Sequence, residues 1–248
     1  MSWQLFGASA IGASHIAGDL PCQDAHAYRR TESGFVGVVC DGAGSAAYSD
    51  IGARLVCAQV VDVLADAITP PETLTAEVAR DRVAWALAGA RNRLARRAVA
   101  ESHALKDYAC TVVGAWMGAH GGWLFHIGDG LGVARLASGD TVSAPENGEY
   151  ANETFFLTGR DWTTHLRMTP VESGCESVLL MSDGAMGFVM DKGGRQVYAP
   201  FFDPVARFLR SSDETPGNEA LQATLADART HGITGDDKTL LIALAPPA

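Results

Sequence analysis

The sequence predicts an α+β fold built on antiparallel sheets. Three observations lead to this class. Apolar strand patterns come in runs, the helical patterns come in pairs, and Gly-rich turns of the hairpin type join successive strands. Helices that follow one another in pairs are expected to lie on the sheets with their apolar faces inward.

The first half of the chain begins with strands and continues with helices. Strands are expected at residues 3–10, 25–28 and 35–40, of which the last is almost wholly apolar. Apolar residues then recur at helical spacing in residues 51–64 and 83–98. Both segments therefore read as amphipathic helices.

The second half returns to strands and closes with helices and a final strand. Gly-rich turns join the first three of these strands, and a looser stretch, residues 144–164, follows them. The expected strands are residues 110–118, 122–127, 131–136, 165–171, 177–181 and 239–244, and the expected helices are residues 204–210 and 218–230.

Length and composition favour one domain that spans residues 1–248. The chain is 47% hydrophobic, which is enough to bury a large core, and it contains no repeat and no linker between residues 30 and 240. The three aromatic residues Tyr108, Trp116 and Trp123 lie in or beside strand patterns, and we expect them to pack in the core.

Charge and cysteine usage exclude several classes of function. The formal net charge of −10 argues against a nucleic-acid surface, and the basic cluster at residues 91–97 reads as a solvated helix face. The 5 cysteines have no close pairing, which is typical of reduced thiols in a cytoplasmic protein and disfavours a cysteine-ligated zinc site. We expect neither a signal peptide nor a membrane span, because no apolar run approaches 18 residues.

Acidic residues mark the ends of four predicted strands. The apolar run FVGVVC ends on Asp41, which Gly42 follows. Similar patterns place Asp129 in Gly-Asp-Gly, Asp183 in Ser-Asp-Gly, and the pair Asp236-Asp237 just before the last strand. A single Asp-Gly is a common turn, but the recurrence of acids at strand ends indicates a shared destination.

Carboxylates that gather in a partly buried site repel one another unless a cation compensates them. Hard oxygen ligands without histidine or cysteine partners select Mg²⁺ or Mn²⁺, and a carbonyl beside a glycine can add another oxygen. Two such metals that share a carboxylate can hold a nucleophilic water. The expected chemistry is therefore hydrolysis of a phosphate ester.

The motifs CQDAHAY, VVCDGAGS, ACTVVGAW, FHIGDGLGVARL, LLMSDGAMGFV and GDDKTLLIAL occur in this order along nearly the whole chain. In this order they resemble the metal-dependent serine/threonine protein phosphatases of type 2C, in particular their divergent bacterial branch. The resemblance implies two antiparallel β-sheets packed as a sandwich and flanked by pairs of helices. It also implies a dinuclear Mn²⁺ or Mg²⁺ centre at one end of the sandwich, a phosphorylated protein as substrate and a serine/threonine kinase as partner.

The resemblance also assigns roles to individual residues. Asp41 resembles the acid that bridges the two metals, and Gly42 resembles the residue that offers its carbonyl. Asp183 and Asp236 match the acids that complete the first metal site, although the neighbour of Asp236, Asp237, leaves an ambiguity of one residue. Two further roles follow from the same resemblance. Asp24 belongs to the metal site and orients metal-held water, and Asp129 belongs to a third, weaker metal site that shares Asp183.

Three departures from the family pattern bear on activity. Gln23 stands where the family has an acid, and Ala43 stands where a histidine often donates a proton. The family's phosphate-binding arginine has no match before residue 23, and His15 is the nearest cationic candidate. We expect His15 to supply the positive donor to the phosphate.

The sequence therefore predicts a hydrolase that removes phosphate from phosphoserine or phosphothreonine in proteins by water held at two Mn²⁺ or Mg²⁺ ions. Two alternatives stay open. One is a catalytically weak phosphatase-like module that binds a phosphorylated partner or a kinase, which the departures at Gln23 and Ala43 favour. The other is a hydrolase of small phosphate esters that uses the same centre.

Overall fold

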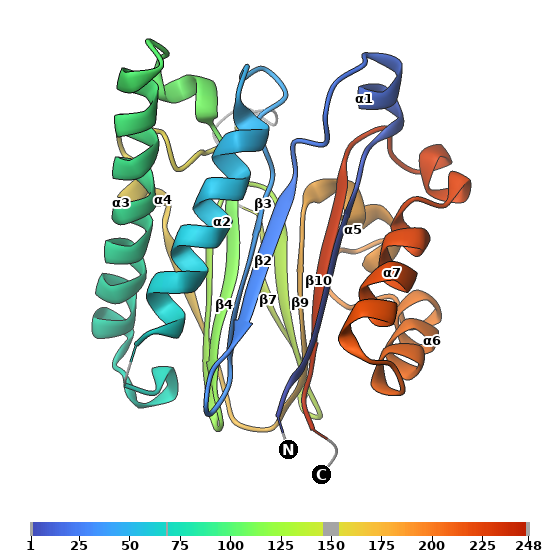
Figure 1. Cartoon of the computed structure of the whole chain (residues 1–248). Helices are drawn as coiled ribbons and strands as arrows, with labels where there is room; N and C mark the ends of the chain where they lie inside the picture. Colours follow the sequence, from blue (N-terminus) through green and yellow to red (C-terminus); the bar gives the residue numbers. More distant parts are fainter. Residues whose placement is uncertain (1, 68, 146–153, 247–248) are drawn as a thin grey trace.

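Two five-stranded antiparallel sheets pack face to face in the computed structural model, which describes residues 2–67, 69–145 and 154–246 (Figure 1). The first sheet has the strand order β1 (Gln4–Ala10), β10 (Lys238–Leu244), β9 (Cys175–Met181), β6 (Leu131–Leu136) and β7 (Gly139–Ser143). The second has the order β2 (Ala25–Arg30), β3 (Phe35–Cys40), β4 (Val112–Gly118), β5 (Gly121–Ile127) and β8 (Arg167–Val171).

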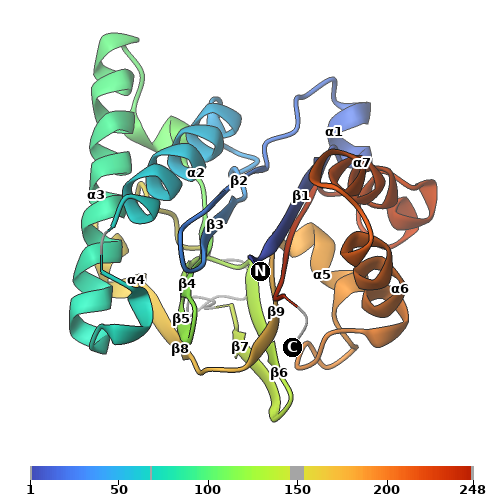
Figure 2. The ribbon, with the colours of Figure 1, turned by 60° about the horizontal axis from the view of Figure 1, so that its bottom comes forward.

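Helices cover the outer faces of both sheets, as Figures 1 and 2 show from two directions. On the second sheet lie α2 (Ser49–Ala65) and α3 (Ala76–Ala100), and on the first lie α5 (Asp183–Val189), α6 (Ala199–Arg210) and α7 (Glu214–Leu225). The shorter helices are α1 (Ala13–Ala17), α4 (Trp162–His165) and the 3₁₀ turns η1 (Pro71–Thr73), η2 (Leu105–Tyr108) and η3 (Ala228–Gly232). None of the helices in the described ranges is long and apolar enough to cross a membrane.

The layered arrangement explains why the central strands are apolar on both faces. In β3, Val36 and Val38 face α2 and α3, whereas Phe35 and Val39 face the other sheet. The middle layer between the sheets also takes Leu5, Leu124, Leu180 and Leu241. A strand with two buried faces loses the polar alternation of a surface strand and reads as a continuous apolar run.

Several expectations about burial are confirmed. Tyr108, Trp116 and Trp123 are buried. The basic cluster at residues 91–97 is largely exposed on α3 around the buried Leu94. All 5 cysteines are free thiols.

Several elements and helix boundaries differ from the sequence-based expectation. The strand β7, the helices α1, α4 and α5 and the turns η1 and η2 were not expected. The helix α3 begins at Ala76 rather than at residue 83, and α7 spans Glu214–Leu225 rather than residues 218–230. The helix expected from Pro204 begins at Ala199, with Pro204 inside it. Proline suits the first turn of a helix, so the sequence alone favours a start at Pro204; here Pro200 occupies that place and Pro204 follows within the same helix.

Antiparallel pairing brings distant segments to one end of the sandwich. Met181, at the end of β9, pairs with Leu240 near the start of β10 and with Leu131 at the start of β6. In the second sheet, Cys40 at the end of β3 pairs with Ala25 at the start of β2. This end also carries α1, at the top of Figure 1.

Candidate metal centre

Four of the strand-end aspartates line one small cavity at this end of the sandwich. Its volume is about 180 Å³, and we call it the aspartate cavity. The lining residues are His15, Gln23, Asp41, Gly42, Ala43, Gly44, Thr111, Asp129, Thr154, Phe156, Asp183 and Asp236. The sequence-predicted residues thus come together here, except for Asp24, which is not part of the lining.

Asp41 and Gly42 sit where β3 leaves its sheet. The Asp41 N–H donates to Thr111 Oγ1 over 3.1 Å, and the Asp41 carbonyl accepts from the Thr111 N–H over 2.8 Å. A Cβ at residue 42 would lie 2.6 Å from the Gln23 carbonyl oxygen and 2.8 Å from Ser49 Cβ. Glycine is required here because two neighbouring segments press against the backbone, which explains why the acid is followed by a residue without bulk.

Asp183 is the first residue of α5, and Asp236 precedes β10. The two segments approach closely, because a Cβ at Gly184 would lie 2.0 Å from the Asp237 carbonyl oxygen. The glycine of Ser-Asp-Gly therefore has a packing function as well as a turn function. Because Gly184 has no side chain, α5 can bring Asp183 beside Asp236.

Asp129 lies in the tight turn between β5 and β6. Thr154 Oγ1 donates to Asp129 Oδ2 over 2.6 Å, while Asp129 Oδ1 is buried without a hydrogen-bond partner among the described residues. Gly128 has φ +109°, a conformation that side chains rarely adopt. A buried carboxylate oxygen without a partner is compatible with the expected role of Asp129 as a metal ligand.

Asp24 lies behind the cavity and is 6% exposed. Ser182 Oγ donates to Asp24 Oδ2 over 2.7 Å, so Asp24 meets the residue that immediately precedes Asp183. Burial raises the pKa of Asp24 to about 7, and the charges of Asp237 and Asp183 add to the effect. Its neighbour Gln23 reaches the cavity instead, with a buried Oε1 that has no partner among the described residues.

The neighbours Asp236 and Asp237 have different surroundings. Asp236 lines the cavity, and its Oδ1 accepts the N–H of Asp237 over 3.0 Å. Asp237 is turned toward the α1 segment and does not line the cavity. This geometry supports Asp236 as the ligand and gives Asp237 another role.

The carboxylates of the cavity repel one another. Burial raises the pKa of Asp41 well above its usual range, and the charges of Asp24, Asp183 and Asp129 raise it further. Burial also raises the pKa of Asp183, with Asp236 and Asp129 as the next causes.

The donor set suits a hydrated divalent cation. Carboxylate oxygens and the carbonyl of Gly42 are hard ligands of the kind that Mg²⁺ and Mn²⁺ take. Among the described residues, no group of three or more His, Cys, Asp or Glu side chains is placed so that it could hold a metal ion. Mg²⁺ characteristically binds one or two carboxylates and keeps several waters, so a smaller set of protein ligands suits it.

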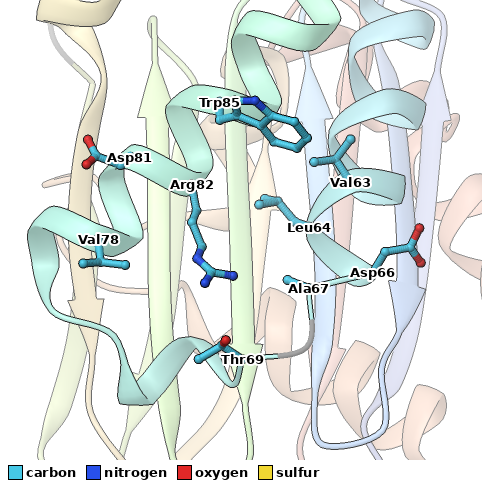
Figure 3. A pocket seen from close by; sticks show the side chains of 9 residues that line it. All are labelled: Val63, Leu64, Asp66, Ala67, Thr69, Val78, Asp81, Arg82 and Trp85. Carbon is cyan, nitrogen blue, oxygen red and sulfur yellow. The ribbon is translucent and has the colours of Figure 1, made fainter.

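A larger pocket of about 630 Å³ lies elsewhere, between the end of α2 and the start of α3 (Figure 3). Its walls include Val63, Leu64 and Trp85, and Trp85 is 71% exposed. None of its lining residues belongs to the aspartate cavity. Size alone therefore does not locate the chemistry of this chain, whereas the convergence of acids does.

A family model described as protein phosphatase 2C matches residues 11–226. The chain belongs to the protein phosphatase 2C family. The predicted family and the predicted enzyme class, a protein phosphatase, are thereby confirmed. The phosphatase is also 31% identical over 253 residues to serine/threonine-protein phosphatase 3 of Escherichia coli (strain K12), an alignment that covers 98% of this chain and 99% of the relative.

Solved structures share the fold at lower sequence identity. A bacterial serine phosphatase superposes with a TM-score of 0.68 at 15% identity, covering 100% of this chain and 99% of the other. The catalytic domain of the serine/threonine protein phosphatase PstP, solved in complex with two manganese ions, superposes with a TM-score of 0.67 at 17% identity over 99% of both chains. The predicted α+β sandwich of antiparallel sheets is therefore confirmed.

Sequence reasoning missed the residues that support the acids. Thr111, Thr154 and Ser182 hold Asp41, Asp129 and Asp24 through their hydroxyl groups or backbone. Thr111 and Ser182 each lie in one of the motifs of the family pattern, so the sequence partly indicated that they are near the acids. Thr154 lies in the stretch that looked structureless and carried no signal.

Proposed function

We propose that this phosphatase hydrolyses phosphoserine and phosphothreonine in phosphorylated proteins, with two Mn²⁺ or Mg²⁺ ions held in the aspartate cavity. The convergence of Asp41, Asp129, Asp183 and Asp236 on one cavity carries the proposal. Family membership supports the reaction, and the 31% identical relative named as a serine/threonine phosphatase supports the substrate class.

The residues of the aspartate cavity would have the following roles. Asp41 would bridge the two ions, the Gly42 carbonyl would complete the second site, and Asp183 and Asp236 would complete the first. Bound there, the cations would neutralise the phosphate and acidify a water for attack on phosphorus. Asp129 and Asp183 would hold a third, weaker ion.

Asp24 acts from behind this set. Its contact with Ser182 Oγ ties it to the start of α5, and Ser182 Oγ in turn accepts the Thr239 N–H over 2.9 Å. Because Asp24 does not line the cavity, we infer that it orients water and ligands through this network rather than by direct metal binding. His15 lines the cavity, where it would meet the phosphate.

The cellular setting follows as part of the same proposal. Five free cysteines fit the reducing cytoplasm, where a serine/threonine kinase would produce the phosphorylated substrate.

A comparison of two substrates tests the proposal. Turnover of a phosphothreonine peptide and of p-nitrophenyl phosphate should be measured with Mn²⁺, with Ca²⁺ and with EDTA. We expect EDTA to abolish turnover of the peptide and Mn²⁺ to restore it better than Ca²⁺, whose looser coordination holds water less well.

Other outcomes would favour the alternatives. Turnover of p-nitrophenyl phosphate without turnover of the peptide would indicate a hydrolase of small esters. Tight binding of the peptide with no turnover of either compound would indicate a binding module. The replacement of an acid by Gln23 favours this alternative, because it removes one charge from the second metal site. Full activity in EDTA would contradict the metal-dependent mechanism.

A further inference from the structure

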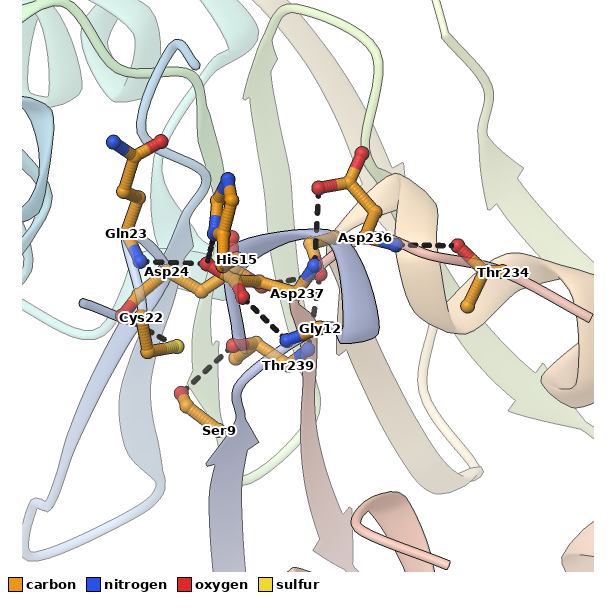
Figure 4. Close-up of polar contacts among 11 residues, drawn as sticks. Ser9, Gly12, His15, Cys22, Gln23, Asp24, Thr234, Asp236, Asp237 and Thr239 are labelled. Carbon is orange, nitrogen blue, oxygen red and sulfur yellow. Dashed lines mark hydrogen bonds and ion pairs between the residues drawn. The ribbon is translucent and has the colours of Figure 1, made fainter. Parts of the chain in front are cut away.

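The carboxylate of Asp237 is buried and accepts three hydrogen bonds. Its side chain is 2% exposed. Its Oδ1 accepts the Gly12 N–H over 2.7 Å, and its Oδ2 accepts the Gln23 N–H over 2.6 Å and contacts His15 Nδ1 over 2.8 Å. These contacts join both ends of the segment that contains α1 to the start of β10 (Figure 4).

The contact with His15 determines which ring nitrogen carries a proton. An ionised carboxylate only accepts hydrogen bonds, so His15 Nδ1 must donate to Oδ2. The other nitrogen, Nε2, lies at the opposite side of the ring, away from Asp237 (Figure 4). His15 also lines the aspartate cavity, and in Figure 4 its ring extends to the same side as the side chains of Gln23 and Asp236.

We propose that Asp237 is a positioning residue, which fixes His15 with Nδ1 toward itself and Nε2 toward the aspartate cavity, where the Nε2–H of the imidazolium form donates a hydrogen bond to the phosphate of the substrate. The inference rests on the proposed function for the identity of the ligand. Asp237 holds the ring of His15 through Nδ1, and two backbone amides hold Asp237 in turn. Nε2 is therefore already in place when the phosphate binds, and no further ordering of the side chain is needed.

The charges around the ring make its position important. Asp237 contacts Nδ1 of the ring, and His15 shares the cavity with Asp41, Asp129, Asp183 and Asp236. Lys238 lies beside Asp237 but is not among the cavity-lining residues. Of the described residues in that lining, His15 is the one whose side chain can carry a positive charge.

An amide at position 237 could not replace the carboxylate. Asn has one acceptor oxygen, and its NH₂ group would face either the Gly12 N–H or the pair formed by the Gln23 N–H and His15. In the second case His15 would have to move its proton to Nε2 in order to accept at Nδ1.

The first test is an NMR measurement on the full chain, with ¹⁵N-labelled histidine and Mg²⁺ as the diamagnetic metal. His15→Gln identifies the His15 signals by their loss. In the wild-type protein we expect the neutral ring to be protonated at Nδ1, and the Nε2 signal to shift on titration with inorganic phosphate. In Asp237→Asn we expect the neutral ring to be protonated at Nε2 or to populate both forms.

The second test is kinetic and uses Asp237→Asn, His15→Gln and the double variant. Each single variant should raise KM for a phosphothreonine peptide by about 10-fold, the scale of a lost charge-assisted hydrogen bond, with a smaller effect on kcat. The double variant should lose no more than His15→Gln alone, because Asp237 acts through His15. His120→Gln, an exposed histidine on the β4–β5 turn, is the matched control and should behave as wild type.

Wild-type His15 protonated at Nε2 when neutral, no response of Nε2 to phosphate, or additive losses in the double variant would each overturn the proposal. If Asp237→Asn fails to fold, which circular dichroism would show, the wild-type NMR result still decides. A phosphate-dependent shift of Nε2 in a protein that hydrolyses no phosphopeptide would leave the positioning role standing and contradict the proposed function instead.

Discussion

At the scale of single residues, the neighbours Asp236 and Asp237 show where sequence reasoning ends. The sequence placed an acidic pair before the last strand and favoured Asp236 as the ligand. The donors that occupy Asp237 are backbone amides of Gly12 and Gln23, which lie 225 and 214 residues away in sequence. No local sequence pattern predicts hydrogen-bond partners so distant in sequence, so only the fold distinguishes the two acids.

This difference leads to a prediction for Asp236. Asp236→Asn removes a ligand charge but keeps the shape of the side chain, so turnover should fall by at least about 100-fold, as when one major electrostatic stabiliser is lost. Affinity for Mn²⁺, measured by calorimetry, should fall in parallel. Asp203→Asn, an exposed change on α6, is the control. Unchanged Mn²⁺ affinity in Asp236→Asn would remove Asp236 from the ligand set.

His126 supports a second prediction, which concerns stability. The ring is fully buried in β5, with Nδ1 3.3 Å from Ser143 Oγ and Nε2 without a partner among the described residues. Burial, helped by the charge of Arg167, lowers its pKa from 6.5 to about 3. The unfolded chain therefore binds a proton that the folded chain does not, so this contribution to stability is present above pH 6.5 and is lost as the pH falls toward 3.

The buried aspartates titrate in the same range with the opposite sign, so the informative quantity is a difference between two proteins. The free energy of unfolding of wild type minus that of His126→Gln should fall by up to about 1.4 kcal/mol per pH unit below pH 6.5, as measured by urea titration. His120→Gln should give no such slope. A difference that stays constant between pH 7.5 and pH 5 would show that His126 is protonated as easily in the folded protein as in the unfolded chain.

At the scale of elements, two helical glycines are expected to respond in opposite ways to the same substitution. A Cβ at Gly184 in α5 would lie 2.0 Å from the Asp237 carbonyl oxygen, whereas a Cβ at Gly89 in α3 would meet nothing within 4 Å. Gly184→Ala should lower the free energy of unfolding by about 1–3 kcal/mol through overpacking. Gly89→Ala should raise it by about 0.4–1 kcal/mol, because alanine restricts the unfolded chain and favours the helix.

The pair also separates packing from metal binding. Gly184→Ala moves the segment that carries Asp183, so it should weaken Mn²⁺ binding in calorimetry, whereas Gly89→Ala should leave Mn²⁺ affinity at the wild-type value. Equal Mn²⁺ affinities in both variants would mean that α5 does not position Asp183 through its contact with the start of β10.

The predicted elements divide according to the strength of their periodicity. The run at residues 35–40 and the first long helix have strong apolar patterns and were predicted to within about two residues, whereas the second long helix was predicted in its centre but begins seven residues earlier, at Ala76. The strand Gly139–Ser143 is short and mostly half-exposed, so it has little apolar signal. The helix Asp183–Val189 starts directly after β9 in a Gly-rich sequence, where the turn signal outweighs the helix signal.

At the scale of the whole molecule, local patterns predicted the class of the fold but not its pairing. That the strand ends with acids meet at one edge follows from the antiparallel register, in which the end of β9 faces the start of β10. The recurrence of acids at strand ends indicated a shared destination, and the resemblance to a known family assigned each acid its role in one centre. The location of Asp24 behind the cavity, rather than in its wall, came from the fold alone.

The assembled cavity couples the stability of the whole protein to metal and pH. Burial and mutual repulsion raise the pKa of Asp41 and Asp183 and bring that of Asp24 to about 7. Groups with a raised pKa in the folded state stabilise it at low pH, and this contribution is lost as the pH rises through the folded-state values. In EDTA, these three groups should therefore favour the folded state less at pH 8 than at pH 6.

Mn²⁺ should reverse this trend, because it would bind the ionised carboxylates of Asp41 and Asp183 in competition with protons, and its charge would favour the ionised form of Asp24 behind them. The difference in Tm between protein in Mn²⁺ and protein in EDTA should therefore widen from pH 6 to pH 8. At a free Mn²⁺ concentration of 100 times Kd, binding should raise the free energy of unfolding by about 2.7 kcal/mol per site. Differential scanning calorimetry at three pH values, with Asp24→Asn and the control Asp203→Asn, measures the gap. Asp24→Asn should flatten the pH dependence, since it removes the carboxyl whose pKa is about 7. A gap that narrows as the pH rises would mean that protons and metal do not compete for these aspartates.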